Sequence, residues 1–109
     1  IINYRKLEIS VNQIKQVIAE NGCVVGGFYV YDSFNDVKSD GVVPLPNVDK
    51  ENLLGGHAIC YTGWNDDREC LEFANSYGYN WGDSGYGWMP YDYVNDSLQN
   101  DFWTITECK

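Results

Sequence analysis

Apolar positions near the start of the chain recur with the period of an amphipathic helix. One helical face would carry Ile14, Val17 and Ile18. Ser10 suits the N-cap position, and Gln13 stands three residues later, which is the spacing of a capping box. The following Asn21-Gly22 ends the pattern, because glycine readily adopts the left-handed conformation that closes helices. The sequence therefore predicts a helix over Ser10–Glu20.

Beyond this helix the apolar positions form short runs and alternations that are typical of β-strands. The predicted strands are Cys23–Tyr31, Leu54–Trp64, Cys70–Ser76, Tyr86–Pro90 and Asp101–Cys108. The second and third of them flank Asn65–Arg68, whose residues favour a turn, so they are expected to form a hairpin. One helix with mainly antiparallel strands predicts a single α+β domain over residues 1–109.

The net charge of the chain argues against negatively charged binding partners. The chain has 109 residues and a formal net charge of −9, which argues against binding to nucleic acid and to anionic membrane surfaces. Its longest uncharged apolar run, Cys23–Tyr31, covers nine residues, whereas a membrane-spanning helix needs about 20. One histidine and the lack of a Cys-x-x-Cys pair fit no zinc template, so we expect no metal and no cofactor.

The single histidine and an asparagine lie on the two strands of the predicted hairpin. A register centred on residue 66 would place His57 and Asn75 directly opposite each other, with Cβ atoms about 5 Å apart. The amide oxygen would then accept a hydrogen bond from one imidazole nitrogen. This bond would fix the tautomer and leave the other ring nitrogen to act as a general base. A neutral orienting group of this kind suits a thiolate–imidazolium pair.

The chain's own cysteines do not suit the role of nucleophile. Four cysteines allow three pairings and leave the disulfide state and the redox compartment open; they are Cys23, Cys60, Cys70 and Cys108. Cys60 is three positions from His57 and Cys70 is five from Asn75, so each points to the opposite face of its strand. In the same register Cys60 and Cys70 are diagonal neighbours, which allows a disulfide between them.

Two motifs in this region resemble the second half of papain-like cysteine peptidases. They are Gly56-His57-Ala58 and, eighteen residues after the histidine, Asn75-Ser76-Tyr77-Gly78-x-x-Trp81-Gly82-x-x-Gly85-Tyr86. The family pattern is His-Ala, followed by Asn-Ser-Trp-Gly-x-x-Trp-Gly-x-x-Gly-Tyr. The Gly41-Val42-Val43-Pro44 and Met89-Pro90-Tyr91 segments and the closing Asp101-Phe102-Trp103-Thr104-Ile105 also look like those of bacterial-type members. The resemblance covers nearly the whole chain.

The resemblance implies a role for each matching residue. His57 would be the general base and imidazolium partner, and Asn75 would orient it. Tyr77 stands where the family has a tryptophan that shields the His–Asn bond from water. Trp81 would form the wall on the leaving side of the substrate. The pocket for the side chain two residues before the scissile bond would be lined by Gly27, Gly56 and Ala58.

Two catalytic elements of the family are missing from these 109 residues. The family's Cys-Gly-Ser-Cys-Trp-type nucleophile segment and its oxyanion-stabilising glutamine have no match here. We therefore expect the β-rich, C-terminal half-barrel of an endopeptidase, inactive alone. Its partners would be the N-terminal half of the same enzyme and a peptide or protein substrate. An exposed apolar patch beside His57 would mark the face that the missing half covers. The resemblance is compatible with a secreted or lysosome-like compartment as well as an intracellular one.

Alternative functions stay open at this point. The chain would also suit a pseudo-peptidase or half-domain that serves as a binding module. Its tyrosine and tryptophan content fits a carbohydrate-binding β domain, although that function would not explain the ordered motif. Trp88 and Trp103 are interpreted as core or surface rings. The acidic residues around Asp66 are interpreted as a solvated turn.

Overall fold

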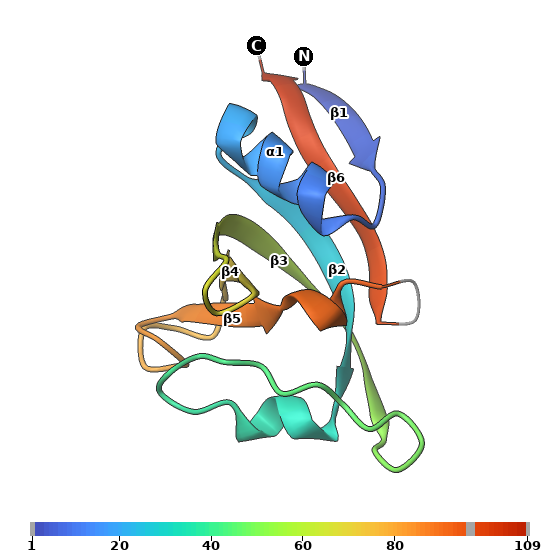
Figure 1. Ribbon diagram of the computed structural model, residues 1–109, viewed down its shortest axis with the longest axis vertical. Helices are drawn as coiled ribbons and strands as arrows, with labels where there is room; N and C mark the ends of the chain where they lie inside the picture. The colour runs from blue at the N-terminus through green and yellow to red at the C-terminus, as the bar shows by residue number, and fades with distance from the viewer. Residues whose placement is uncertain (1, 96–97, 109) are drawn as a thin grey trace.

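A computed structural model of the chain describes residues 2–95 and 98–108, with only the backbone described at residues 2–4, 100 and 104–108. One α-helix, α1, spans Val11–Asn21. The strands are β1 (Ile2–Leu7), β2 (Val24–Tyr31), β3 (Leu53–Asn65), β4 (Cys70–Ala74), β5 (Tyr86–Pro90) and β6 (Gln99–Cys108). Two short 3-10 helices, η1 (Asp32–Asp36) and η2 (Tyr91–Tyr93), follow β2 and β5. Figure 1 shows how these elements are arranged.

The six strands form one open, antiparallel sheet in the order β1-β6-β2-β3-β4-β5. Helix α1 lies across one face of the sheet near the end where β1 and β6 pair, and β5 runs across the direction of β2, so the sheet is curled (Figure 1). The predicted α+β class and the half-barrel with one N-terminal helix are confirmed. β1 was not foreseen as a strand, because its partner β6 lies at the other end of the chain.

The predicted helix is confirmed with a shift of one residue at each end. The Ser10 hydroxyl accepts a hydrogen bond from the Gln13 backbone N–H at 3.3 Å, and Gly22 closes the helix with a φ of 86°. The second hydrogen bond of a capping box, from the N-cap backbone N–H to the Gln13 side chain, is replaced here by a bond from another residue. The Gln13 amide oxygen accepts from the Glu8 backbone N–H at 2.6 Å, rather than from the N–H of Ser10. The side chain therefore ties the loop before the helix to its first turn.

Aromatic rings fill the inside of the curled sheet. Phe28, Tyr61, Phe73 and Phe102 are all fully buried. The Tyr61 ring lies 6.1 Å from Phe73 and 5.7 Å from Phe102, which links β3, β4 and β6. The predicted apolar face of α1 packs against this cluster. Along β2 and β3 the buried side chains alternate with exposed ones, so the other face of the sheet, called here the open face, carries Val25 at 43% exposure.

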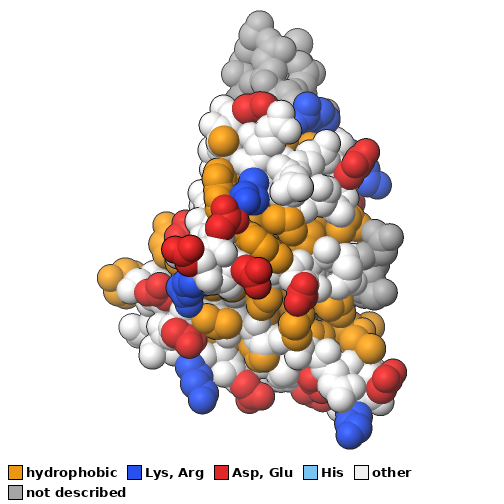
Figure 2. All heavy atoms as spheres, viewed as in Figure 1, with side chains coloured by type: hydrophobic (Ala, Val, Ile, Leu, Met, Phe, Trp, Pro, Cys, Tyr) orange, Lys and Arg blue, Asp and Glu red, His pale blue; other side chains and the backbone are white. Residues whose placement is uncertain are grey.

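The surface is acidic but not uniformly so. Figure 2 shows acidic side chains scattered over the face in view, with basic ones between them and hydrophobic ones exposed near the centre. The acidic turn near Asp66 is partly structured: its carboxylate accepts hydrogen bonds from Lys15 Nζ at 2.7 Å and from the Tyr91 hydroxyl at 2.6 Å. Within the described residues, no helix is both long and apolar enough to cross a membrane.

Candidate functional site

His57 and Asn75 are in direct contact. The imidazole Nε2 lies 2.9 Å from the Asn75 side-chain oxygen Oδ1. The same oxygen accepts a hydrogen bond from the Ser76 backbone N–H at 2.8 Å. A backbone N–H can only donate, so it fixes Oδ1, and not the amide nitrogen, as the atom that faces both groups. Nε2 must then be the donor to Oδ1, and the neutral imidazole keeps its lone pair on Nδ1. Among the described residues, Nδ1 has no hydrogen-bond partner.

The contact arises from a different strand register than the one predicted. The β3–β4 pairs run from Asn65 opposite Cys70 to Cys60 opposite Ala74, with an irregularity after Tyr61. The predicted register, centred on residue 66, is wrong because the ladder next to the turn is centred between residues 67 and 68, and the irregularity brings that centre back only to residue 67. If the ladder continued, Asn75 would face residue 59, and His57 would be its diagonal neighbour on the same side. Diagonal neighbours remain within reach of long side chains.

A tight glycine-rich loop fixes Asn75 just beyond the end of β4. The Asn75 backbone N–H donates to the Gly85 carbonyl at 3.0 Å, so both ends of the loop meet. Gly82 has a φ of +57°, and a Cβ atom there would lie 2.6 Å from the Tyr86 carbonyl oxygen. Only glycine avoids this contact. The spacing of glycines in the sequence motif thus builds the loop that holds the orienting amide.

Aromatic rings surround the imidazole. Tyr77 stacks on His57, with ring centroids 5.2 Å apart and an interplanar angle of 28°. Phe28, the strand partner of His57 on β2, meets the imidazole edge-on at 5.8 Å. Phe34 of η1 lies 6.4 Å from the imidazole and stacks on Trp81 at 5.7 Å. Sequence reasoning missed Phe34, because it lies 43 residues before Tyr77 and 47 residues before Trp81, the two rings that it contacts.

The rings differ in how much water reaches them. Tyr77 is 55% exposed, so one side of the stack is open to solvent. Trp81 is only partly exposed, because it also packs against Phe73 at 5.9 Å and meets Tyr77 edge-on at 5.9 Å. Tyr77 therefore lies over the histidine, and Trp81 packs beside Tyr77 without a ring contact to the imidazole among the described residues.

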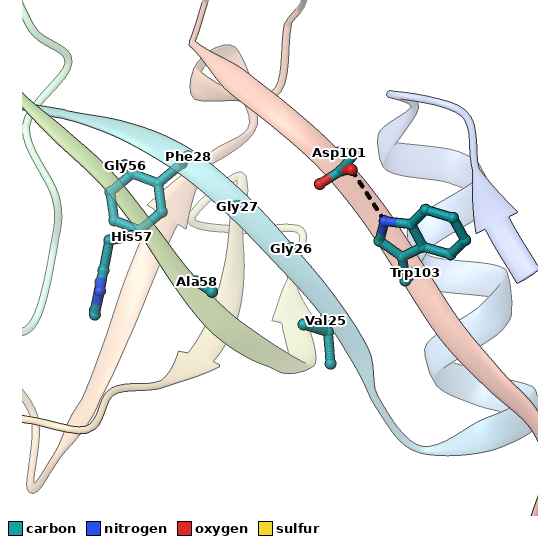
Figure 3. Close-up of a pocket in the computed structure, with 9 residues that line it drawn as sticks. All are labelled: Val25, Gly26, Gly27, Phe28, Gly56, His57, Ala58, Asp101 and Trp103. Carbon is teal, nitrogen blue, oxygen red and sulfur yellow. Dashed lines mark hydrogen bonds between the residues drawn. The ribbon is translucent and has the colours of Figure 1, made fainter. Parts of the chain in front are cut away.

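A pocket of about 300 Å³ opens beside His57 on the open face of the sheet. It is lined by the three small residues proposed for a substrate pocket, Gly27, Gly56 and Ala58. Asp101 and Trp103 of β6 form its opposite wall, as Figure 3 shows. Sequence reasoning missed Asp101, and it interpreted Trp103 as a core or surface ring without a pocket role. The signal that could have revealed them is the alternation along β6, which places both on the face opposite the buried Phe102.

The cysteines are placed away from the imidazole or are already bonded. Cys23 and Cys60 form a disulfide between β3 and the residue that precedes β2, with Cα atoms 6.3 Å apart. The predicted option of a Cys60–Cys70 disulfide is wrong, because Cys70 pairs with Asn65 at the far end of the hairpin. Cys70 is a free, buried thiol, and burial raises its pKa above the ordinary value. The Cys108 side chain lies outside the described part of the structure.

Among the described residues, no three or more histidine, cysteine, aspartate or glutamate side chains lie close enough together to hold a metal ion.

Comparison with known proteins identifies relatives along almost the whole chain. Residues 1–103 match the sequence model described as papain family cysteine protease. An uncharacterised peptidase C1-like protein of Acanthamoeba polyphaga mimivirus is 40% identical over 100 residues, which cover 89% of this chain and 32% of that protein. Cathepsin B-like cysteine proteinase 4 of Caenorhabditis elegans is 37% identical over 78 residues, covering 70% of this chain and 22% of that protein.

The fold is similar to that of a solved cysteine protease. The crystal structure of xylellain, a cysteine protease from Xylella fastidiosa, superposes with a TM-score of 0.89 and 34% sequence identity, over 98% of this chain and 40% of xylellain. The chain thus spans between about a fifth and two fifths of the length of the relatives described here.

Proposed function

The chain belongs to the papain family of cysteine proteases, and we propose that it forms the histidine-bearing part of an endopeptidase that hydrolyses peptide bonds through an acyl-enzyme. The observation that carries the proposal is the hydrogen bond from His57 Nε2 to Asn75 Oδ1, which leaves Nδ1 free to exchange a proton. These two residues are proposed as catalytic.

The proposed reaction uses Nδ1 of His57 twice. Nδ1 first takes the proton of a cysteine thiol, and the resulting thiolate attacks the carbonyl carbon of the scissile bond. The imidazolium then donates that proton to the leaving amine, and a thioester joins the substrate's acyl group to the cysteine. Nδ1 next takes a proton from water, the hydroxide attacks the thioester, and the thiol is regenerated with its proton. Throughout, the Nε2–H bond to Asn75 holds the ring in one orientation.

The nucleophile is proposed to come from a segment outside these 109 residues. Cys23 and Cys60 are joined to each other. Cys70 lies opposite Asn65, eight residues along β3 from His57, which is about 26 Å of strand. The backbone of Cys108 pairs with Ile2 at the far end of β6, five residues beyond the pocket wall. These placements favour a cysteine that another segment brings to the imidazole.

Exposed apolar side chains around the site support a segment that packs there. Val25, Leu54 and Tyr77 are 43, 52 and 55% exposed. Each lines a hollow that also borders His57 or Asn75. Exposed apolar side chains gathered at one place are typical of a surface that another chain or segment covers. The proposed occupant of this surface is the nucleophile-bearing half of the same enzyme.

The remaining residues are proposed to bind substrate or protect the catalytic pair. Tyr77 covers one face of the imidazole and limits the access of water to its bond with Asn75. Trp81 forms a wall on the leaving side of the substrate. The substrate side chain two residues before the scissile bond would enter the pocket that contains Gly27, Gly56 and Ala58. A peptide or protein is the proposed substrate.

Complementation tests the proposal. The 109-residue chain alone should hydrolyse no peptide and should not react with an epoxide probe for active-site thiols. Addition of a nucleophile-bearing half in trans should restore both activities, and His57→Ala should abolish the hydrolysis. Tyr79→Ala is the matched control for changes near the site, because Tyr79 lies in the same loop but is 76% exposed.

Two results would contradict the proposal. Robust hydrolysis by the 109 residues alone would show that the nucleophile is within them. Restored hydrolysis that survives His57→Ala would remove the histidine from the mechanism. If the two halves bind each other but hydrolyse nothing, and His57→Ala leaves that binding intact, the chain acts as a binding module instead.

A further inference from the structure

We propose that the pocket beside His57 selects a cationic side chain, lysine or arginine, and that Asp101 is the residue that determines this specificity. The inference rests on the proposed function, since it names the substrate class that the same site would take. It is carried by the position of the Asp101 carboxylate in the wall of the pocket. Figure 3 shows this carboxylate on β6, across β2 from Ala58 and His57 on β3.

The floor of the pocket is formed by β2 at Gly27, a residue that has no side chain. Strand β2 lies between β3 and β6, and its side chains alternate between the core and the open face. Gly26 faces the core, where a Cβ atom would lie 2.7 Å from the Phe102 ring. By alternation Gly27 faces the open side, where it is paired with Ala58 of β3. The small residues on β2 and β3 therefore leave a hollow that reaches across to β6.

A β-bulge brings Asp101 to the edge of this hollow. Gly26 pairs with Phe102, but Phe28 pairs with Gln99, so β6 has one residue more than β2 between these two pairs. In the strand pairing, the backbone of residues 100 and 101 is therefore opposite the single residue Gly27. Bulges of this kind bend the strand and redirect a side chain. The extra residue thus places a carboxylate beside the position where β2 has no side chain.

The carboxylate is held in place and retains capacity for a ligand. The Trp103 indole N–H donates to Asp101 Oδ2 at 3.0 Å. No described group bonds to the other oxygen, Oδ1. An ionised carboxylate can accept several hydrogen bonds, and a guanidinium or ammonium group supplies donors of matching charge.

The surroundings favour a cation over an anion. Among the residues that line the pocket, the titratable ones are Asp101 and His57. His57 belongs to the catalytic pair, and in Figure 3 its ring points away from the Asp101 wall. The net charge of −9 repels acidic peptides and attracts basic ones. Lys6 already lies over the Trp103 ring, with Nζ 5.9 Å from the centroid, so the indole accepts a cation on one face.

The rest of the lining suits the stem of such a side chain. Lysine and arginine carry three or four methylene groups below the charged head, and these pack well against apolar surface. Val25 and Ala58 provide that surface along the path from β3 to β6. A purely apolar substrate side chain would fill the same space, but it would partly desolvate Asp101 Oδ1 without giving that oxygen a hydrogen-bond partner.

A binding experiment tests the inference without any need for catalysis. The 109-residue chain is titrated with Nα-acetyl-arginine methylamide and with the citrulline analogue, which has nearly the same shape but no charge. Binding is followed by the amide NMR signals of Gly27 and Ala58 and the indole N–H signal of Trp103. The arginine ligand should bind about tenfold tighter, which corresponds to about 1.4 kcal/mol.

Two matched variants identify the source of the preference. Asp101→Asn keeps an acceptor for the Trp103 indole but removes the charge, and it should abolish the preference. Asp83→Asn makes the same change at a second Asp–Trp pair, where the Trp88 indole donates to Asp83 Oδ2 at 3.3 Å, and it should leave the preference intact. Equal affinity for the two ligands in the unchanged chain, or a preference that survives Asp101→Asn, overturns the inference.

Hydrolysis separates this inference from the proposed function. The chain complemented by a nucleophile-bearing half is given two fluorogenic peptides that differ only in arginine or citrulline two residues before the scissile bond. About tenfold higher kcat/KM for arginine, lost in Asp101→Asn, is the expected result. Equal hydrolysis of both peptides refutes the specificity and leaves the peptidase in place. No hydrolysis together with preferential binding of arginine refutes the peptidase and leaves the pocket's specificity in place.

Discussion

Replacement of Asn75 by alanine should change the tautomer of the chain's single histidine. Asn75 Oδ1 accepts one hydrogen bond from His57 Nε2–H and one from the Ser76 backbone N–H. The bond to the imidazole exists only in the tautomer with the proton on Nε2. A net contribution of about 1 kcal/mol for one such bond corresponds to about a fivefold shift in the ratio of the two tautomers. In the alanine variant the Nε2–H form should therefore lose about this factor relative to Nδ1–H.

Nitrogen-15 NMR of the imidazole, at a pH where the ring is neutral, measures this ratio directly. The chain has one histidine, so the spectrum contains one imidazole and needs no further assignment. Asn75→Asp keeps an acceptor at the same place and should retain the Nε2–H form. Asn65→Ala removes an amide oxygen that accepts from the Arg68 backbone N–H at 3.1 Å, far from the site, and it serves as the neutral control.

Two outcomes would refute the reasoning. A dominant Nδ1–H tautomer in the unchanged chain would mean that Asn75 does not accept from Nε2. An unchanged ratio in Asn75→Ala would mean that something other than this amide, such as the stacked aromatic rings, determines the tautomer. Either result would remove the observation on which the proposed catalytic role depends.

Two further predictions concern stability. Gly87→Ala should destabilise the fold by about 1–3 kcal/mol, since a Cβ atom there would lie 2.6 Å from Phe73 Cε1. Gly63→Ala should cost less in the same urea titration, because its Cβ would meet only the Glu72 side chain, with the nearest atom at 3.4 Å. The hydrogen bond from Lys15 is the main cause that lowers the pKa of Asp66, and the hydrogen bond from Tyr91 is the second. The ionised Asp66 therefore stabilises the fold above the ordinary pKa of about 4, and this stabilisation is lost as the pH falls through the lowered pKa. Asp66→Asn should therefore lose less stability than the unchanged chain between neutral pH and pH 3, and equal losses would contradict the assignment.

The elements predicted correctly are those determined by local sequence. The helix follows from the Ser10 cap, the apolar face and Gly22, all within about a dozen residues. The β3–β4 hairpin follows from two apolar runs around an acidic turn. The contact between His57 and Asn75 was also found, although for a partly incorrect reason: a direct opposition was predicted, and the structure has a diagonal pair beyond the last residues of the ladder.

The features that were missed depend on contacts between distant segments. The Cys23–Cys60 disulfide requires knowledge that the start of β2 lies beside the middle of β3. The packing of Phe34 near the imidazole requires the position of η1 relative to the glycine-rich loop. Alternation along β6 indicates only which face Asp101 is on; its place in the pocket wall also requires knowledge that β6 pairs with β2 and has an extra residue opposite Gly27.

The bulge in β6 has a consequence for how this protein can vary. The residue that borders Gly27 is set by the length of β6, whereas His57 and Asn75 are held by β3 and by the loop after β4. Deletion of one residue at the bulge would exchange the charged side chain at the pocket for its neighbour without moving the imidazole or the amide. Insertions and deletions in one strand thus offer an evolutionary route to new substrate preferences that leaves the catalytic pair unchanged.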